Sequence, residues 1–487
     1  MFRRLVALLV CASLLPAQGQ ALPDLGDASD AVLSEKQEST IGNRIMREIR
    51  VDPAFLDDPE ISDYLRALGE RLHNSADPPR RTVEFFIVKD ESVNAFALIG
   101  GHIGIHSGLF LLTRSEAELA GVVAHEIAHL LQRHQSRLHQ AQTKFQLASL
   151  AAFALGIIAA SRGNSSQSGQ IAEAALTSAG AIAIQGQLNY TRDHEREADR
   201  VGLVLLERAG FDPRGMVTFF ERMQRANRLT EFKGAPSYLR THPLTVERIA
   251  DMQSRVDTMA PRLGPDSFEY RLARAKLRAV SGAPAEAIAW FRGQLASQTV
   301  LRPREEVFGL AFALRRARDF DAAFRELAAI REGKSTHPAF ELLHAQLLAD
   351  LKRTDASLAA FESAIKTYPH HRGLAYGQAE VLIEAGRPAE AVALLAQRTK
   401  LYPDEAIAFE LLSKGYAATG QRLLQHRAQA EAYYRRGNLG RAVDQLELAT
   451  RLRQSDDFDM AIAEARLREL RSLLQVQKEA EKALKIS

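Results

Sequence analysis

VVAHEIAHLL, residues 122–131, places two histidines four positions apart inside an apolar helical pattern. Side chains at this spacing lie on one face of a helix, where His125 and His129 can both reach a tetrahedral Zn²⁺. Glu126 can then face the metal's water and take its proton as that water attacks a carbonyl carbon. Histidines also lie hydrogen-bonded in ordinary cores, so a zinc site with Glu126 as general base needs support from a further ligand.

A second motif, HEREADRVG, supplies that ligand. A catalytic zinc needs a third protein ligand and one open position, and we expect Glu195 to be the third ligand. Asp199, one helical turn later, is placed to accept the outer N–H of a ligating histidine, the alternative being an ordinary surface charge. Glu197 points about 200° away from Glu195 around the helix, and His194 is a weaker competitor for the metal.

Helices and a few strands are expected around these motifs. Ser115 and Glu118 form a capping box, which predicts a helix from there through His129 to about His139. His134 and His139, past the motif on this helix, are predicted to be surface residues. The other expected elements are two helices between residues 35 and 72 separated by Pro53 and Pro59, a strand at 83–88, a hairpin turning at Gly100 and Gly101, and a helix at 188–209.

The first residues have the pattern of an export signal, with Arg3, Arg4, an apolar run at 5–15 and small residues ending at Ala21. A buried N-terminal helix is the alternative. Cleavage after Ala21 would remove Cys11, the single cysteine of the chain. The exported protein is therefore expected to hold no disulfide, and its stability must come from packing and metal.

The formal net charge of +3 falls by two when the arginines of the leader are removed. Glu and Asp are interspersed with the arginines of the C-terminal half, which favours a solvated mixed-charge surface and no nucleic-acid partner. Hydrophobic residues at 46% and charged residues at 25% are typical of globular proteins and exclude disordered and multi-spanning classes.

Two apolar segments within residues 142–186 are joined by the polar stretch SRGNSSQSG. The first segment is ~15 residues long, shorter than the ~20 residues that span a bilayer. We predict a helical hairpin that covers an active site or contacts a membrane surface. A plain buried hairpin and a transmembrane pair are the alternatives.

From about residue 265 onward, one helical element recurs, and its middle copies are 34 residues apart. This period is typical of tetratricopeptide repeats, whose paired helices stack into a solenoid, although an ordinary helical bundle is an alternative. A longer last interval leaves room for one more helix near residues 421–433. The Pro- and Gly-containing stretch 260–267 is the predicted domain boundary. The last apolar residues of the copies are Phe291, Leu327, Phe361, Leu395 and Leu446.

HEIAH followed by EREAD, with NAFALIGGHIGIHSGLF before them and THPLTVERI after, resembles the BepA-type, β-barrel assembly-enhancing zinc metallopeptidases. This type belongs to the HExxH/ExxxD family that contains the HtpX and CAAX-prenyl proteases. The resemblance covers about residues 40–260, and the repeat tail matches too. It implies a mainly α fold with a small β-sheet, in which a signal peptide (1–21) and a zincin-like zinc metallopeptidase domain (22–260) precede an α-solenoid of tetratricopeptide repeats (261–487).

The resemblance also implies one Zn²⁺ per chain and roles for further residues. His242 would approach the zinc and occupy its open site, keeping the enzyme latent; an oxyanion donor and a capping residue before Pro243 are the alternatives. Arg248 would anchor this loop. An edge strand that pairs with an extended substrate backbone would comprise Ile103, Gly104, Ile105, His106 and Ser107.

By the same resemblance, the substrates are unfolded or stalled outer-membrane β-barrel proteins, and the repeats bind the β-barrel assembly machinery. The expected location is the periplasm, with peripheral contact to the outer membrane. The main hypothesis is a chaperone-like quality-control endopeptidase that degrades misassembled barrels. The alternative is a repeat adaptor or chaperone with a largely latent protease. A structural zinc site is disfavoured, because such sites usually fill all four positions with Cys and His.

Overall fold

The computed structural model describes residues 33–76, 82–140, 192–229, 237–262, 264–297, 303–331, 337–452 and 457–483. The predicted signal peptide and the apolar hairpin at 142–186 lie outside these residues. Helices dominate the described chain, together with a four-stranded sheet, as the sequence predicts. Across the described ranges, no helix is both long enough and apolar enough to cross a membrane.

The sheet has the strand order β1-β2-β4-β3. Strands β2 and β4 run parallel, and β3 returns antiparallel to β4. The predicted hairpin turns at Gly100 and Gly101, whose φ angles of 92° and 94° are unfavourable for other residues. The strands are β1 (Phe55–Leu56), β2 (Glu84–Val88), β3 (Ala95–Leu98) and β4 (His102–His106).

The predicted edge strand is wrong. Strand β4 is paired on both sides, by β2 and by β3, so it offers no free edge. The sequence indicates the β3–β4 hairpin but not the distant β2, which pairs with the remaining side of β4. Within the part of the chain that the structure describes, no strand pairs with the other side of β3, which is therefore the free edge of the sheet. The residues concerned are Ile103, Gly104, Ile105 and His106 in β4, and Ser107, which begins helix α4 (Ser107–Leu112).

Helices pack on both faces of the sheet because β2 alternates its apolar side chains. Phe86 packs in one cluster with residues of α2 (Glu35–Arg50), and Phe85 packs on the other face with residues of α3 (Pro59–His73) and α5 (Glu116–Leu131). The N-terminal domain is completed by α6 (His134–Gln140), α10 (Arg192–Arg208), α11 (Arg214–Leu229), α12 (Ser237–Thr241) and α13 (Val246–Val256).

The predicted single helix from Ser115 to about His139 is interrupted. Helix α5 ends at Leu131, and α6 begins at His134. Between them Arg133 has a φ of 50°, a left-handed conformation that costs a non-glycine residue about 1–2 kcal/mol. Its guanidinium donates hydrogen bonds to Glu38 in α2 (2.9 Å), so a distant contact stabilises the break.

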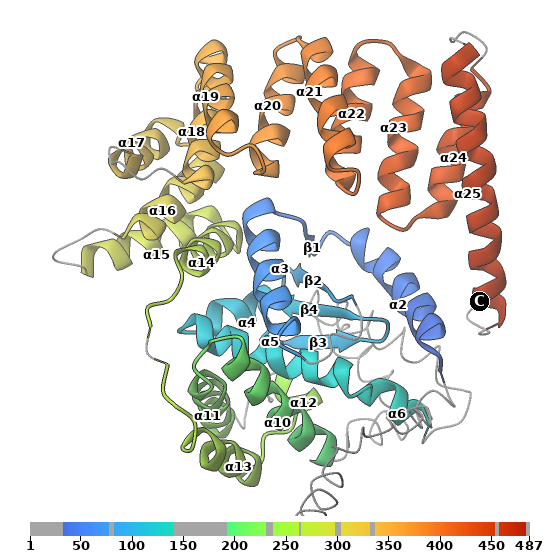
Figure 1. The fold of residues 1–487 in the computed structure, drawn as a ribbon. Helices are drawn as coiled ribbons and strands as arrows, with labels where there is room; N and C mark the ends of the chain where they lie inside the picture. The colour runs from blue at the N-terminus through green and yellow to red at the C-terminus, as the bar shows by residue number, and fades with distance from the viewer. Residues whose placement is uncertain are drawn as a thin grey trace, which may run out of the picture.

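Beyond residue 264, paired helices stack as the repeats predict (Figure 1). The five recurring apolar residues that revealed the period are 0–1% exposed, and the extra helix expected near residues 421–433 is α23. The helices of this solenoid are α14 (Phe268–Val280), α15 (Pro284–Ser297), α16 (Arg304–Arg316), α17 (Phe320–Arg331), α18 (Pro338–Asp350), α19 (Thr354–Thr367), α20 (Arg372–Glu384), α21 (Pro388–Leu401), α22 (Ala406–Ala418), α23 (Arg422–Arg435), α24 (Leu439–Thr450) and α25 (Asp457–Ala483).

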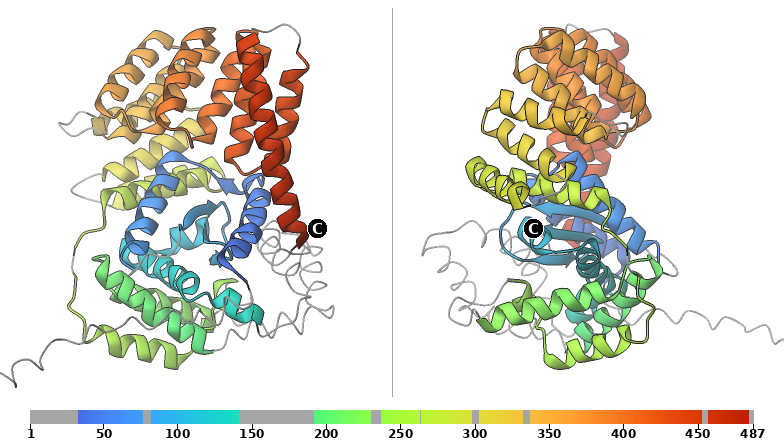
Figure 2. Two further views of the ribbon diagram at one scale, coloured as in Figure 1. Left: turned by 45° about the vertical axis from the view of Figure 1, so that its right-hand side comes forward. Right: turned by 90° about the vertical axis from the view of Figure 1, so that its left-hand side faces the viewer.

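The solenoid arches over the N-terminal domain and contacts it at both ends (Figures 1 and 2). Helix α14 contributes Tyr270 and Leu277 to the core of the N-terminal domain and Leu272 to the first core of the solenoid. At the other end, Arg47 of α2 forms an ion pair with Glu481 of α25.

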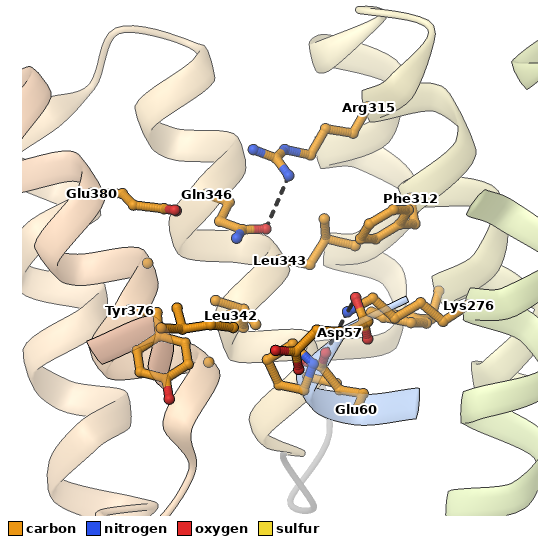
Figure 3. A pocket seen from close by; sticks show the side chains of 17 residues that line it. Asp57, Glu60, Lys276, Phe312, Arg315, Leu342, Leu343, Gln346, Tyr376 and Glu380 are labelled. Atoms are coloured by element: carbon orange, nitrogen blue, oxygen red, sulfur yellow. Dashed lines mark hydrogen bonds and ion pairs between the residues drawn. The ribbon is translucent and has the colours of Figure 1, made fainter. Parts of the chain in front are cut away.

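The start of α3 also reaches the solenoid, beside a pocket of about 220 Å³ (Figure 3). Lys276 of α14 is buried there and forms ion pairs with Asp58, at 2.8 Å, and with Glu60. On the neighbouring side, Arg372 of α20 lies 2.9 Å from Asp63. Buried charges are stable only when they are paired, so these contacts fix the orientation of α3 relative to the solenoid.

Replacing Lys276 by Met should destabilise the protein by about 3–5 kcal/mol, because two carboxylates lose their buried partner. The measurement is the midpoint of urea unfolding. Lys366→Met on the exposed side of α19 is the matched control and should leave the midpoint unchanged. Equal midpoints for the two variants would show that the ion pairs do not stabilise this interface.

Candidate active site

Helix α5 carries the HExxH motif through the interior of the N-terminal domain. Ser115 caps the N-terminus of this helix, and its hydroxyl accepts the N–H of Glu118 at 3.2 Å. Beyond this cap, apolar residues on all sides bury the helix almost completely, and His125, Glu126 and His129 are 0%, 1% and 4% exposed. The motif therefore lies in a water-poor environment, where its charges and hydrogen bonds are strong.

Helix α10 carries the second motif and packs against α5. At Gly202, an added Cβ would lie 3.3 Å from the backbone nitrogen of His125, so glycine permits this close approach. The approach brings Glu195 to both histidines, with an oxygen 3.5 Å from His125 Nε2 and another 3.4 Å from His129 Nε2. The carboxylate of the second motif therefore lies next to both histidines of the first, as a shared metal site requires.

Four side chains converge at this point: His125, His129, Glu195 and His242. One nitrogen or oxygen from each lies within 4.8 Å of the others, and all four residues are buried. The Nε2 atoms of His125 and His129 are 3.0 Å apart. Three imidazoles and one carboxylate form a donor set that suits a divalent transition metal.

His242 enters the cluster from the segment that follows α12. Its Nδ1 lies 3.1 Å from Glu195, and its Nε2 lies 3.5 Å from Glu126. Tyr238, one turn earlier, packs its ring against His242 at 4.7 Å and accepts the N–H of His242 with its backbone carbonyl. His242 is predicted from the sequence, but the packing role of Tyr238, whose phenol is fully buried, is not.

Asp199 and Arg248 contact the clustered residues and fix their orientation. Asp199 Oδ1 lies 3.1 Å from Nδ1 of His125, the nitrogen that faces away from Glu195. The Arg248 guanidinium donates to both oxygens of Asp199 at 2.8 Å and lies 2.9 Å from Glu195. It also donates to the carbonyl of Pro243, so the expected anchoring of the His242 loop is present.

Burial and charge set the protonation of the cluster. Burial raises the pKa of Glu126, against the opposing charges of His242 and His125. Burial also opposes ionisation of Glu195, but His242 and Arg248 outweigh it and hold the pKa of Glu195 well below its usual range. Burial lowers the pKa of His129 well below its ordinary value, which favours the neutral imidazole that binds metals.

Both carboxylate oxygens of Glu126 are buried and, among the described residues, have no well-oriented hydrogen-bond partner. A buried carboxylate without such a partner is unfavourable unless another group completes the site. Together with the donor set, this observation indicates that the residues fit a metal ion and its water.

The structure differs from the sequence analysis at His134. It was expected on the surface, but it is fully buried, and its Nδ1 lies 2.8 Å from Nδ1 of His129. Glu197 and His194 lie outside the four-residue cluster and contact His134 instead. No local signal identifies His134, because Gln132 and Arg133 are ordinary helix formers and the break between α5 and α6 depends on distant contacts.

Comparisons with known proteins agree with this geometry. The Peptidase family M48 profile matches residues 59–256, and a tetratricopeptide-repeat profile matches residues 348–415. The chain is 33% identical to the putative beta-barrel assembly-enhancing protease of Vibrio cholerae, with 96% of each chain covered. It is 31% identical to the beta-barrel assembly-enhancing protease of Yersinia pestis (94% and 93% covered) and 29% identical to that of Escherichia coli K12 (96% of each).

These matches extend over nearly the full length of each relative, and the buried His and Glu cluster lies inside the matched peptidase region. The chain therefore belongs to Peptidase family M48, among the beta-barrel assembly-enhancing proteases, and is a metallopeptidase with a repeat domain.

Proposed function

We propose that this protein is a zinc endopeptidase that cleaves unfolded or stalled outer-membrane β-barrel proteins. The observation that carries the proposal is the buried cluster of His125, His129, Glu195 and His242 beside Glu126. The first three would hold one Zn²⁺, and Asp199 would support His125 from outside. The absence of cysteine from the site and the presence of an adjacent carboxylate favour a catalytic over a structural metal.

When bound, zinc supplies a Lewis acid that polarises a peptide carbonyl and lowers the pKa of water toward ~7. Glu126 takes the proton from the attacking water and passes it to the leaving amine. The same carboxyl group can accept this proton and later release it. Arg248 holds both Asp199 and Glu195 in place through its ion pairs.

The substrate would bind as an added strand along β3. The carbonyl of Asn94 accepts the N–H of His106, and ladder bonds in an antiparallel pair come from alternate residues. Ala95 and Ala97 therefore direct their backbone groups to the free edge. In agreement, the carbonyl of Ala97 accepts from the side chain of Gln135, and its N–H faces Glu126. Main-chain pairing of this kind tolerates many sequences.

The names of the relatives and the predicted leader support a periplasmic role in barrel assembly. The solenoid would bind the assembly machinery or its clients, since stacked repeats present an extended surface for proteins. Peripheral contact with the outer membrane completes the proposal.

A second candidate is an adaptor or chaperone whose protease is largely latent. The position of His242 favours this second candidate, because its side chain contacts Glu195 and approaches Glu126 at the proposed metal site. Bound to the metal, His242 would exclude the substrate carbonyl. The two candidates share one site and differ in how often it is open.

Glu126→Gln should lower kcat/KM for an unfolded barrel protein by about 10²–10⁴-fold, because the general base is lost. Binding of the substrate and the zinc content should be unchanged. Glu70→Gln on the exposed face of α3 is the control and should cleave like the wild type. Full cleavage by zinc-loaded Glu126→Gln protein would disprove the mechanism.

His242→Ala should raise the rate of cleavage several-fold, because the fourth position at the metal becomes accessible. Zinc content measured by atomic emission should stay near one per chain, since three ligands remain. If cleavage instead falls sharply while zinc is retained, His242 is an oxyanion donor and the latency proposal is wrong.

Ala97→Pro should raise KM for an extended peptide about tenfold, because it removes an N–H on the free edge; since this N–H also faces Glu126, the test is read from KM and not from kcat. Proline is tolerated in edge strands when the lost N–H lies outside the ladder, so the thermal unfolding midpoint should change little. A variant with intact folding and an unchanged KM would exclude β3 as the substrate strand.

A further inference from the structure

His134 lies beside the cluster of His125, His129, Glu195 and His242 but is not part of it. Its Nδ1 is 2.8 Å from Nδ1 of His129, and its Nε2 is 3.1 Å from a carboxylate oxygen of Glu197. Arg137 lies 3.0 Å from the same oxygen. A hydrogen-bonded chain therefore runs from His129 to Glu197 and Arg137, whose side chains are 36% and 39% exposed.

The direction of each hydrogen bond follows from the orientation of His129. Its Nε2 faces the other cluster residues, so metal binding requires this nitrogen to be unprotonated and the proton to sit on Nδ1. The Nδ1–H then donates to Nδ1 of His134, which must accept. The proton of His134 consequently sits on Nε2, where it donates to Glu197. The carboxylate of Glu197 therefore favours the same tautomers of His134 and His129 that metal binding requires.

The backbone is built to bring these rings together. In an uninterrupted helix, residues five positions apart would point about 140° away from each other. The left-handed Arg133 ends α5 and turns α6, so that His134 packs against His129 with ring centres 4.9 Å apart. Hydrogen bonds from Arg133 and Ser136 to the buried Glu38 stabilise this strained turn. The unfavourable backbone conformation of Arg133 is consistent with a functional requirement for the contact between His129 and His134.

The two proposed histidine ligands are supported differently. His125 has a buried carboxylate, Asp199, as its direct outer partner. His129 instead contacts the imidazole of His134, which in turn contacts the carboxylate of Glu197. We propose that His134 is the positioning residue for His129 and that Glu197 fixes the tautomer of His134, so that both are needed for tight zinc binding. This inference rests on the proposed zinc site.

The test is the zinc dissociation constant, measured by competition with a chromophoric chelator. His134→Phe keeps an aromatic ring of similar shape but removes both nitrogens, and it should weaken zinc binding about 10–100-fold. His134→Gln retains an oxygen acceptor for His129 and N–H donors for Glu197, so it should restore part of the affinity. Glu197→Ala should weaken binding by a smaller factor, because His134 can still accept.

His73→Phe, which changes a buried histidine far along α3, is the matched control for His134→Phe, and Glu207→Ala is the control for Glu197→Ala on the same helix. Unfolding midpoints of the metal-free proteins monitor folding. Wild-type affinity in His134→Phe, or equal losses in His73→Phe, overturns the positioning role. If His134→Phe does not fold, Glu197→Ala decides: an affinity equal to that of Glu207→Ala overturns the inference. Failure of the wild type itself to bind zinc refutes the proposed function instead.

Discussion

The guanidinium of Arg248 joins three parts of the active site. It donates two hydrogen bonds to Asp199, forms an ion pair with Glu195 and donates to the carbonyl of Pro243 beside His242. Burying two carboxylates next to each other is costly, and a planar group with five donors is well suited to offset that cost. Because Arg248 belongs to α13, the cluster on α5 and α10 can be complete only when α13 has packed against them.

The arrangement around this residue explains how the candidate metal site is assembled in the interior of the domain. Apolar side chains bury α5, Gly202 permits the close approach of α10, and α12 brings His242 to the remaining side. Helix α3 packs against α5 on one side and pairs its first turn with Lys276 and Arg372 of the solenoid on the other. The repeats that would bind a partner and the helix that carries Glu126 are thus connected through α3.

Much of this could be predicted because the decisive patterns are local or periodic. His125 and His129 share a helical face through their spacing, and Glu195 and Asp199 do so on a second helix. The 34-residue period also indicated which apolar residues recur in the buried core of the solenoid, such as Phe361 and Leu395. Helix α23 confirms the additional helix that the longer last interval predicted near residues 421–433.

The amino-acid sequence by itself determined the motifs, the helix types and the repeat period. The tertiary structure decided which strand has a free edge, because β2, far from β4 in sequence, occupies the side of β4 that a hairpin leaves open. It also decided that α5 stops at Leu131 and that His134 turns inward. That break requires Arg133 to adopt a left-handed conformation, which hydrogen bonds to Glu38, 95 residues away, stabilise. Contacts over such separations leave no pattern in the local sequence.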